Sequence, residues 1–276
     1  MMNKQNLESS KKDSNPVSPD SASKETRLSG FSLLNNPHIN KGTAFTREER
    51  DEFCLAGLLP DAVENIELQL QRALQHLGQK STDLERYIYL IALYDRCETL
   101  FYRLVMSDLQ RFLPIIYAPT VGEACLKFAH IFRRPHGMFV SIRYKGRIRE
   151  ILRNWPMRDV RFICVSTGGR ILGLGDLGAN GMGIPVGKLQ LYTACAAIPP
   201  DVLLPLLLDI GTTNEALLSD PLYFGIRQAP PPTEELDAFV DEFINAAQET
   251  FPACCVHFED WKGVDAIRIL ARYRDK

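Results

Sequence analysis

The feature that most constrains this chain is a change in hydrophobic periodicity near residue 137. Before it, apolar residues recur at helical spacing, as Val63, Ile66 and Leu70 do. After it, short β-branched and aromatic runs alternate with helical stretches. Such alternation is typical of a mainly parallel sheet covered by helices. The sequence therefore predicts an α/β fold: a helical N-terminal region followed by a small, mainly parallel sheet flanked by helices.

Capping boxes mark the helix starts expected in the N-terminal region. Residues 46–49 (Thr-Arg-Glu-Glu) and 82–85 (Thr-Asp-Leu-Glu) each place a hydroxyl and a carboxylate where they can bind free backbone N–H groups. The second box is predicted to open one long apolar helix that runs through Tyr94 towards Leu109. A third helix is expected to start at 120–123.

The second half of the chain is expected to contain five strands, several of which end in a carboxylate. Ligands of open α/β sheets bind outside the carboxyl ends of the strands, so we expect the functional site at that edge. The predicted strands are 138–142, 160–165, 170–176, 202–209 and 255–260, the predicted helices 186–197 and 234–249, and the strand-end carboxylates Asp176, Asp209, Glu259 and Asp260.

Residues 1–36 are rich in Ser, Asn and Lys and contain too little apolar surface to offset the entropy of ordering, so they are predicted to be disordered. The predicted organisation is thus a 1–36 tail, a 37–136 helical region and a 137–276 α/β region.

No apolar run reaches the ~18 to 20 residues that span a bilayer. The N-terminus resembles neither a signal peptide nor a mitochondrial presequence. We expect a cytoplasmic protein with no membrane partner.

Charge and cysteine content narrow the functional classes further. A net charge of -2 gives no electrostatic signature of nucleic-acid binding, so no nucleic-acid partner is expected. The seven cysteines are an odd set without a C-x-x-C pair. They are interpreted as reduced, buried thiols, as in a cytosolic protein, and not as disulfides or a zinc site.

Two phosphate-binding motifs match only in part. Residues 173–178 fit G-x-G-x-x-G, but Asp176 would sit inside the phosphate-binding turn, and a glycine-rich loop is expected to follow in place of a helix. Residues 183–188 resemble a P-loop, but the glycine spacing is one residue short and Leu189 replaces the magnesium-binding Ser or Thr. We reject both.

Lys188 and the Glu259-Asp260 pair remain as candidate site residues. Pro185 favours a helix start, which places Lys188 in the opening turn of that helix. There the helix dipole and desolvation disfavour the charged ammonium, so Lys188 could act as a general base. The alternative is a lysine that extends from the helix end into solvent. Glu259 and Asp260 would suit Mg²⁺ or Mn²⁺ if the strand breaks into a loop there; otherwise they are an acidic strand end facing water. His257 shares a face with Glu259 and is expected to be buried in the strand.

Several stretches together resemble the malic enzymes, and the similarity runs in order from about residue 36 to the end. The stretches are 40–46 (Asn-Lys-Gly-Thr-Ala-Phe-Thr), 114–122 (Pro-Ile-Ile-Tyr-Ala-Pro-Thr-Val-Gly), 130–135 (His-Ile-Phe-Arg-Arg-Pro), 170–196, 208–212, 220–223 and 258–260. Malic enzymes oxidise L-malate with NAD or NADP, decarboxylate the bound oxaloacetate and release pyruvate and CO₂, with Mg²⁺ or Mn²⁺. The resemblance implies this activity, these cofactors and L-malate as substrate.

The resemblance also implies roles for individual residues. Tyr117 looks like the general acid that protonates the enolpyruvate carbon, and Lys188 like the base that takes the malate hydroxyl proton. Arg170 looks like the residue that binds the substrate carboxylate and contacts the cofactor. Glu259 and Asp260 look like two of the three protein ligands of the metal.

Other positions are more ambiguous or depart from the family pattern. Arg72 and Arg96 match an effector site that binds an activating dicarboxylate in some members; ion-paired surface arginines are the alternative. The family usually has Thr-Asp-Gly-Glu-Arg where residues 166–170 read Ser-Thr-Gly-Gly-Arg, so two carboxylates beside Arg170 are missing. Gly263 stands where Asn or Gln is common.

Family members continue beyond the position of Lys276 into the third metal carboxylate and a dinucleotide-binding domain. We therefore expect the C-terminal dinucleotide-binding domain to be absent and the chain to be the N-terminal half of a malic enzyme that forms a homo-oligomer. One alternative is a non-catalytic truncated fragment or isoform that pairs with a full-length subunit. Another is part of a malolactic enzyme. The sequence does not separate NAD from NADP preference.

Overall fold

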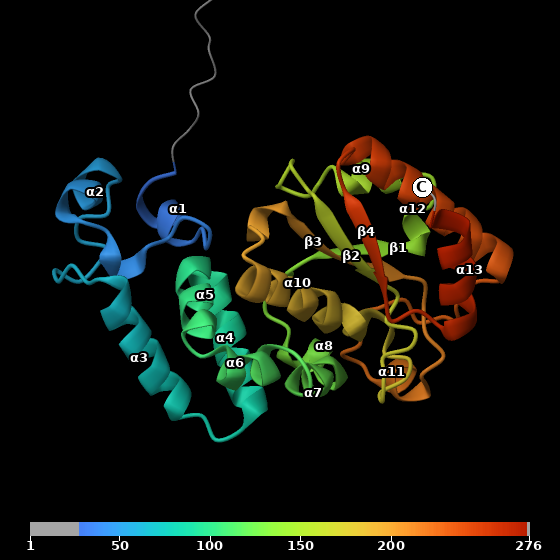
Figure 1. The fold of residues 1–276 in the computed structure, drawn as a ribbon, viewed down its shortest axis with the longest axis horizontal. Helices are drawn as coiled ribbons and strands as arrows, with labels where there is room; N and C mark the ends of the chain where they lie inside the picture. Colours follow the sequence, from blue (N-terminus) through green and yellow to red (C-terminus); the bar gives the residue numbers. More distant parts are fainter. Residues whose placement is uncertain (1–27, 275–276) are drawn as a thin grey trace, which may run out of the picture.

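The computed structural model describes residues 28–274, and it divides visibly into a helical part and an α/β part (Figure 1). No helix in the described range is long and apolar enough to cross a membrane. The helical part contains α1 (Gly30–Leu34), the 3₁₀ turn η1 (Gly42–Ala44), α2 (Arg47–Glu52), α3 (Ile66–Gly78), α4 (Asp83–Arg96), α5 (Glu98–Ser107), α6 (Leu109–Ile116), α7 (Thr120–Leu126) and α8 (Phe128–Ile131).

The α/β part alternates strands and helices. Its elements are β1 (Met138–Ser141), η2 (Ile142–Tyr144), α9 (Ile148–Leu152), β2 (Phe162–Ser166), η3 (Gly178–Met182), α10 (Gly183–Ala196), η4 (Pro200–Val202), β3 (Leu203–Asp209), α11 (Glu215–Ser219), α12 (Thr233–Thr250), β4 (Cys255–Glu259) and α13 (Gly263–Tyr273).

The four strands form one parallel sheet in the order β1-β3-β2-β4, which confirms the predicted fold class. Every residue of β3 is buried, as expected of a strand with helices on both faces. One face packs on α9, α12 and α13 in a single apolar core. The other packs on α10 through contacts of Leu189 with Cys164 and Leu203. The sheet is thus the middle layer of three.

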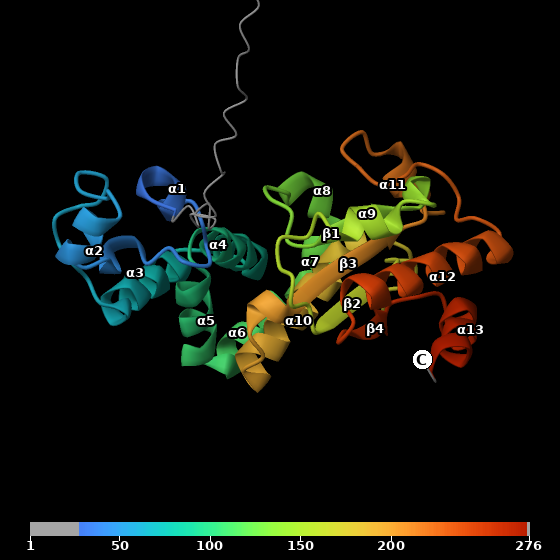
Figure 2. The ribbon, with the colours of Figure 1, turned by 90° about the horizontal axis from the view of Figure 1, so that it is seen from above.

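Helix α10 joins the two parts of the molecule. It packs on β2 and β3 on one side and on α5, α6 and α7 on the other. In Figures 1 and 2 it lies between the helical part and the sheet. A side chain on α10 can therefore contact residues from both parts.

Two predicted elements are wrong. The stretch 170–176 is a loop and not a strand, because Gly173 and Gly175 adopt positive φ angles of 77° and 80° and the chain folds back to a single bridge between Ile171 and Gly175. The long helix predicted from residue 82 towards Leu109 is two helices, α4 and α5, and α6 begins at Leu109. Its break is at Cys97, whose thiol donates to the Asn40 carbonyl at 2.9 Å.

The predicted disordered tail lies mostly outside the described residues, at 1–27. Its last part is described, and there the prediction is wrong, since Gly30–Leu34 forms a short helix. Leu33 from this helix is 4% exposed and packs with Phe45 and Leu55. The division into regions at 136/137 stays a prediction.

The cysteines are all free thiols, but the expectation that they are buried holds for only some of them. Cys97, Cys125 and Cys164 are buried, Cys254 is half-buried, and Cys54, Cys195 and Cys255 are exposed.

Candidate functional site

The candidate site lies at the carboxyl ends of β2 and β4. These strands are neighbours in register, with Ser166 opposite Glu259. The loops that follow them touch, because the Arg170 N–H donates to the Asp260 carbonyl at 3.2 Å. Asp260 has a φ of 55°, so the strand breaks there and the carboxylates of Glu259 and Asp260 are not forced onto opposite faces.

Glu259 is contacted at both carboxylate oxygens. The Lys188 Nζ lies 2.9 Å from its Oε1, and the His257 Nε2 lies 2.6 Å from its Oε2. Lys188 comes from α10, where it lies in the second turn and not in the predicted opening turn. Its ammonium also stands 5.4 Å from the ring centre of Tyr117, at the end of α6. Three elements thus converge on one lysine.

The electrostatics of this cluster differ from the expected loss of charge on Lys188. Burial lowers the Lys188 pKa, but the hydrogen bond and the charge of Glu259 outweigh it, so the Lys188 pKa is raised. Glu259 has a lowered pKa, through His257 first and then Lys188, against the opposing effect of burial. Burial raises the pKa of Tyr117, which keeps its phenol protonated. Lys188 and Glu259 are therefore a charged pair beside a neutral phenol.

The Asp260 carboxyl has a raised pKa, because the positive charge near it does not offset the effects of burial and of Glu259. Burial, and then the charge of Glu259, raise its pKa to about 6. Two adjacent carboxylates of this kind suit a hard divalent cation with oxygen ligands. Within residues 28–274, no group of three or more His, Cys, Asp and Glu side chains is arranged to hold a metal. The described residues therefore fit part of a Mg²⁺ or Mn²⁺ ligand set.

Arg170 is on the same loop cluster, whereas Arg72 and Arg96 are not. The Arg170 side chain is exposed and makes no ion pair within the described range. Arg72 and Arg96 line a separate cavity of about 240 Å³ near η1 and α3. Arg72 there bonds Glu64 and helps to lower the Glu64 pKa to about 2.

The other two carboxylates predicted at strand ends, Asp176 and Asp209, stabilise loops, and only Asp209 ends a strand. Asp176 accepts from the Gly178 N–H at 3.0 Å and from the Thr213 N–H at 2.8 Å, which ties the glycine-rich loop to the segment after β3. The loop joins β2 to η3 and α10, so the expectation that a longer glycine-rich loop follows residues 173–178 in place of a helix is wrong. The rejection of the dinucleotide motif stays a prediction. Asp209 is 7% exposed and accepts from the Ile226 N–H at 2.8 Å.

Two residues that hold the elements of the site in place, Gly187 and Trp261, were not predicted from the sequence. Gly187 lets α10 approach Tyr117: a Cβ there would lie 2.9 Å from the Ile116 carbonyl oxygen and 2.9 Å from the Tyr117 ring. Trp261, directly after Asp260, is buried and donates from its indole N–H to the Val165 carbonyl at 3.2 Å. Both depend on neighbours distant in sequence, so no local pattern could reveal them. His257 shares a face with Glu259 as predicted, but the expectation that it is buried is wrong: it is half-buried, and the sequence did not predict its contact with Glu259.

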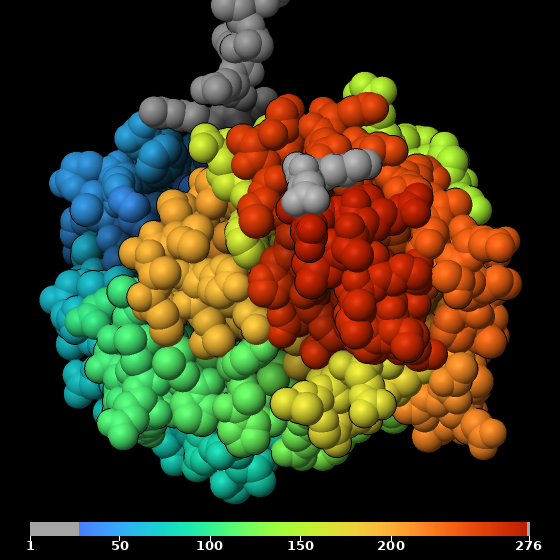
Figure 3. Space-filling view, turned by 45° about the vertical axis from the view of Figure 1, so that its right-hand side comes forward, coloured from blue at the N-terminus to red at the C-terminus, as the bar shows by residue number. Residues whose placement is uncertain are grey.

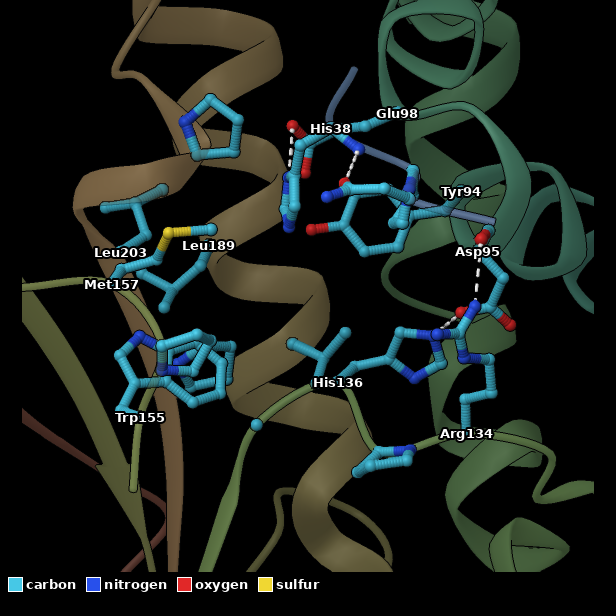
Figure 4. A pocket seen from close by; sticks show the side chains of 18 of the residues that line it. His38, Tyr94, Asp95, Glu98, Arg134, His136, Trp155, Met157, Leu189 and Leu203 are labelled. Carbon is cyan, nitrogen blue, oxygen red and sulfur yellow. Dashed lines mark hydrogen bonds and ion pairs between the residues drawn. The ribbon is translucent and has the colours of Figure 1, made fainter. Parts of the chain in front are cut away.

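A cavity of about 740 Å³ lies apart from this cluster, between α10 and the helical part (Figure 4). Leu189, Leu203 and Trp155 line one side, and two imidazole–carboxylate pairs line the other. None of the five predicted site residues lines it. Cavity size therefore does not identify the candidate site here; the convergence of charged side chains does.

Comparison with known proteins agrees with the resemblance seen in the sequence. The family model described as malic enzyme, N-terminal domain, matches residues 94–274. NADP-dependent malic enzyme of Rattus norvegicus is 48% identical over 254 residues, which are 92% of this chain and 44% of that protein. The chloroplastic NADP-dependent malic enzyme of Zea mays is 49% identical over 246 residues, 89% of this chain and 39% of that protein. The chain spans less than half the length of these relatives. The chain belongs to the malic enzyme family.

Proposed function

We propose that this chain supplies the malate- and metal-binding part of a malic enzyme, which converts L-malate to pyruvate and CO₂ with a nicotinamide dinucleotide and a divalent metal. The observation that carries the proposal is the convergence of Tyr117, Lys188 and Glu259 at the carboxyl ends of β2 and β4. A proton donor, an amine and a carboxylate within reach of one small substrate are the groups that this reaction needs. The relatives' names support NADP as the dinucleotide.

The protonation states suggest how the residues divide the work. Tyr117 holds its proton at neutral pH, so it can donate that proton to the enolpyruvate carbon. Lys188 stands next to the ring and can return a proton to the phenolate. To accept the malate hydroxyl proton, Lys188 must first leave Glu259, because their pairing raises the Lys188 pKa. Arg170 is suited to bind a substrate carboxylate with two parallel N–H groups.

Glu259 and Asp260 would hold the metal, which when bound supplies Lewis-acid stabilisation of the substrate oxygen. Hydride transfer needs the nicotinamide against the malate carbinol carbon, and such positioning is worth roughly 7 to 11 kcal/mol of the barrier. The chain matches 44% of the rat relative, so the experiment should supply the remaining part of that protein.

The test is malate-dependent NADP reduction by the purified chain, alone and mixed with the unmatched C-terminal part of the rat relative, in the presence of Mn²⁺. We expect turnover in the mixture, with a large loss for Lys188→Gln and for Tyr117→Phe. Turnover that is the same in the Lys188→Gln mixture would refute the proposed role. A mixture that never turns over, although the two parts associate, would favour a non-catalytic fragment.

A further inference from the structure

His257 contacts the Glu259 carboxylate from the regular part of β4. Alternate residues of a strand face the same side, so the two side chains lie on one face of the sheet. The His257 Nε2 lies 2.6 Å from the Glu259 Oε2. Because an ionised carboxylate only accepts hydrogen bonds, the imidazole N–H at Nε2 is the donor. A charge-assisted bond of this kind is stronger than one between neutral groups.

The imidazole of His257 is itself packed against neighbouring side chains. His257 pairs in register with Cys164 of β2, which is buried. The imidazole centre lies 6.0 Å from the ring centre of Phe162, and the Phe162 ring packs edge-on against Tyr192 of α10 at 5.2 Å. Glu259 is the last residue of β4. A packed ring on the strand therefore limits the rotation of a carboxylate at the strand end.

The two contacts of Glu259 respond differently to a cation. The Lys188 ammonium, 2.9 Å from Oε1, carries a positive charge and would be repelled by a divalent cation bound at that oxygen. An imidazole N–H donates whether or not the ring is charged, so the bond from His257 to Oε2 can persist. Oε1 is thus the oxygen whose partner can be exchanged, and Oε2 is the one that His257 keeps.

We propose that His257 is a positioning residue for the metal-binding carboxylate: its N–H holds the Glu259 Oε2, so that the carboxylate is oriented before a divalent cation binds. The inference rests on the proposed function, in which Glu259 is a metal ligand, and it gives His257 no ligand role. Partners that orient a metal ligand in this way contribute roughly ten- to a hundredfold to metal affinity. Without His257, the carboxylate would lose its rotational freedom only on binding the metal.

The test is a titration with Mn²⁺, followed through the electron paramagnetic resonance signal of the free ion. It uses the purified chain, alone and mixed with the unmatched C-terminal part of the rat relative. His257→Phe keeps a ring beside Phe162 but removes the donor, and we expect it to weaken Mn²⁺ binding by roughly ten- to a hundredfold. His257→Gln loses the ring but keeps a side-chain N–H, and we expect it to bind Mn²⁺ more tightly than His257→Phe. A purely structural role for the ring predicts the reverse order, which would overturn the inference.

Two further variants separate the possible failures. His130→Phe makes the same substitution at a histidine that contacts Asp220 at 2.8 Å, and it should leave Mn²⁺ binding unchanged. If Glu259→Gln weakens Mn²⁺ binding but His257→Phe does not, this inference is wrong and the proposed function stands. If the wild-type chain binds no Mn²⁺, alone or in the mixture, both are wrong. If the bound Mn²⁺ shows a nitrogen hyperfine coupling that His257→Phe removes, His257 is itself a ligand, and the positioning role is overturned.

Discussion

At the scale of single residues, each group in the cluster sets the charge of the next. His257 and Lys188 hold the two oxygens of Glu259, Glu259 keeps Lys188 charged, and Lys188 lies beside the Tyr117 ring. Burial by itself would push Lys188 towards the neutral form. A change at any one of these residues therefore alters the protonation of its neighbours as well as its own contacts.

His38 gives a pH-dependent contribution to stability that can be measured. The hydrogen bond that the His38 imidazole donates to the Glu98 carboxylate raises the His38 pKa above its ordinary 6.5. Protonated His38 therefore stabilises the fold below pH 6.5, and this contribution is lost as the pH rises through the folded-state pKa. The His38 side chain is 40% exposed, so screening limits the effect to about 0.5 kcal/mol.

We expect His38→Gln to lower the melting temperature more at about pH 5.5 than at about pH 8.5, as followed by circular dichroism. His76→Gln, at an exposed histidine of α3, is the control for the loss of an imidazole as such. An equal loss at both pH values for His38→Gln would contradict the assignment.

The cysteines should separate into two classes of reactivity. Thiolate is the reacting form, and burial raises the pKa of Cys125 and of Cys164 to about 12. We expect a disulfide reagent at mildly alkaline pH to modify the exposed thiols of the folded chain and to reach the buried ones only after unfolding, as read by peptide mass spectrometry. Modification of Cys125 as fast as that of Cys195 would show that the core opens readily. The exposed thiols are Cys54, Cys195 and Cys255.

At the scale of elements, the contact between α10 and the end of α6 depends on Gly187. We expect Gly187→Ala to destabilise the chain by about 1 to 3 kcal/mol in urea denaturation, since the added methyl would collide with the Ile116 carbonyl and the Tyr117 ring. It should also weaken malate binding by moving Tyr117 away from Lys188.

Gly78 provides a matched control, because it is also helical and a Cβ there would meet nothing within 4 Å. Gly78→Ala should leave stability unchanged or raise it by up to about 1 kcal/mol, through the higher helix propensity of alanine. Wild-type stability in Gly187→Ala would mean that the two helices have room to separate.

The elements also show what the sequence could and could not predict. Four strands were predicted to within a few residues, because each is a continuous apolar run. The run at 170–176 looks similar, but the positive φ angles of Gly173 and Gly175 turn it into a loop. The residue types of the site were readable, whereas the contact between Lys188 and Glu259 was not. That contact depends on β4 lying beside β2, and no local pattern encodes the strand order.

At the scale of the whole molecule, α13 presents an apolar stripe to solvent. Val264, Ile267 and Leu270 are 78%, 74% and 63% exposed, while Ile269 and Tyr273 on the other face are buried against the core. The helix forms part of the broad red surface in Figure 3. Exposed apolar stripes of this kind favour association.

We expect the isolated chain to self-associate at micromolar concentration and the triple variant Val264→Lys, Ile267→Glu, Leu270→Lys to do so less, as measured by light scattering. Leu172→Lys, which replaces a single leucine that is 94% exposed on the loop after β2, is the control and should change little. A wild-type chain that stays a monodisperse monomer would contradict the prediction.

The strand order has a consequence for biosynthesis. The ribosome makes β1 and then β2, but these strands are not neighbours in the finished sheet. Each must pair with β3, so neither can form a native ladder until translation has passed Asp209. The nascent chain thus carries two unpaired apolar strands from the end of β2 at Ser166 until β3 has been made as far as Asp209. During that interval the unpaired strands expose apolar surface that favours association with other chains.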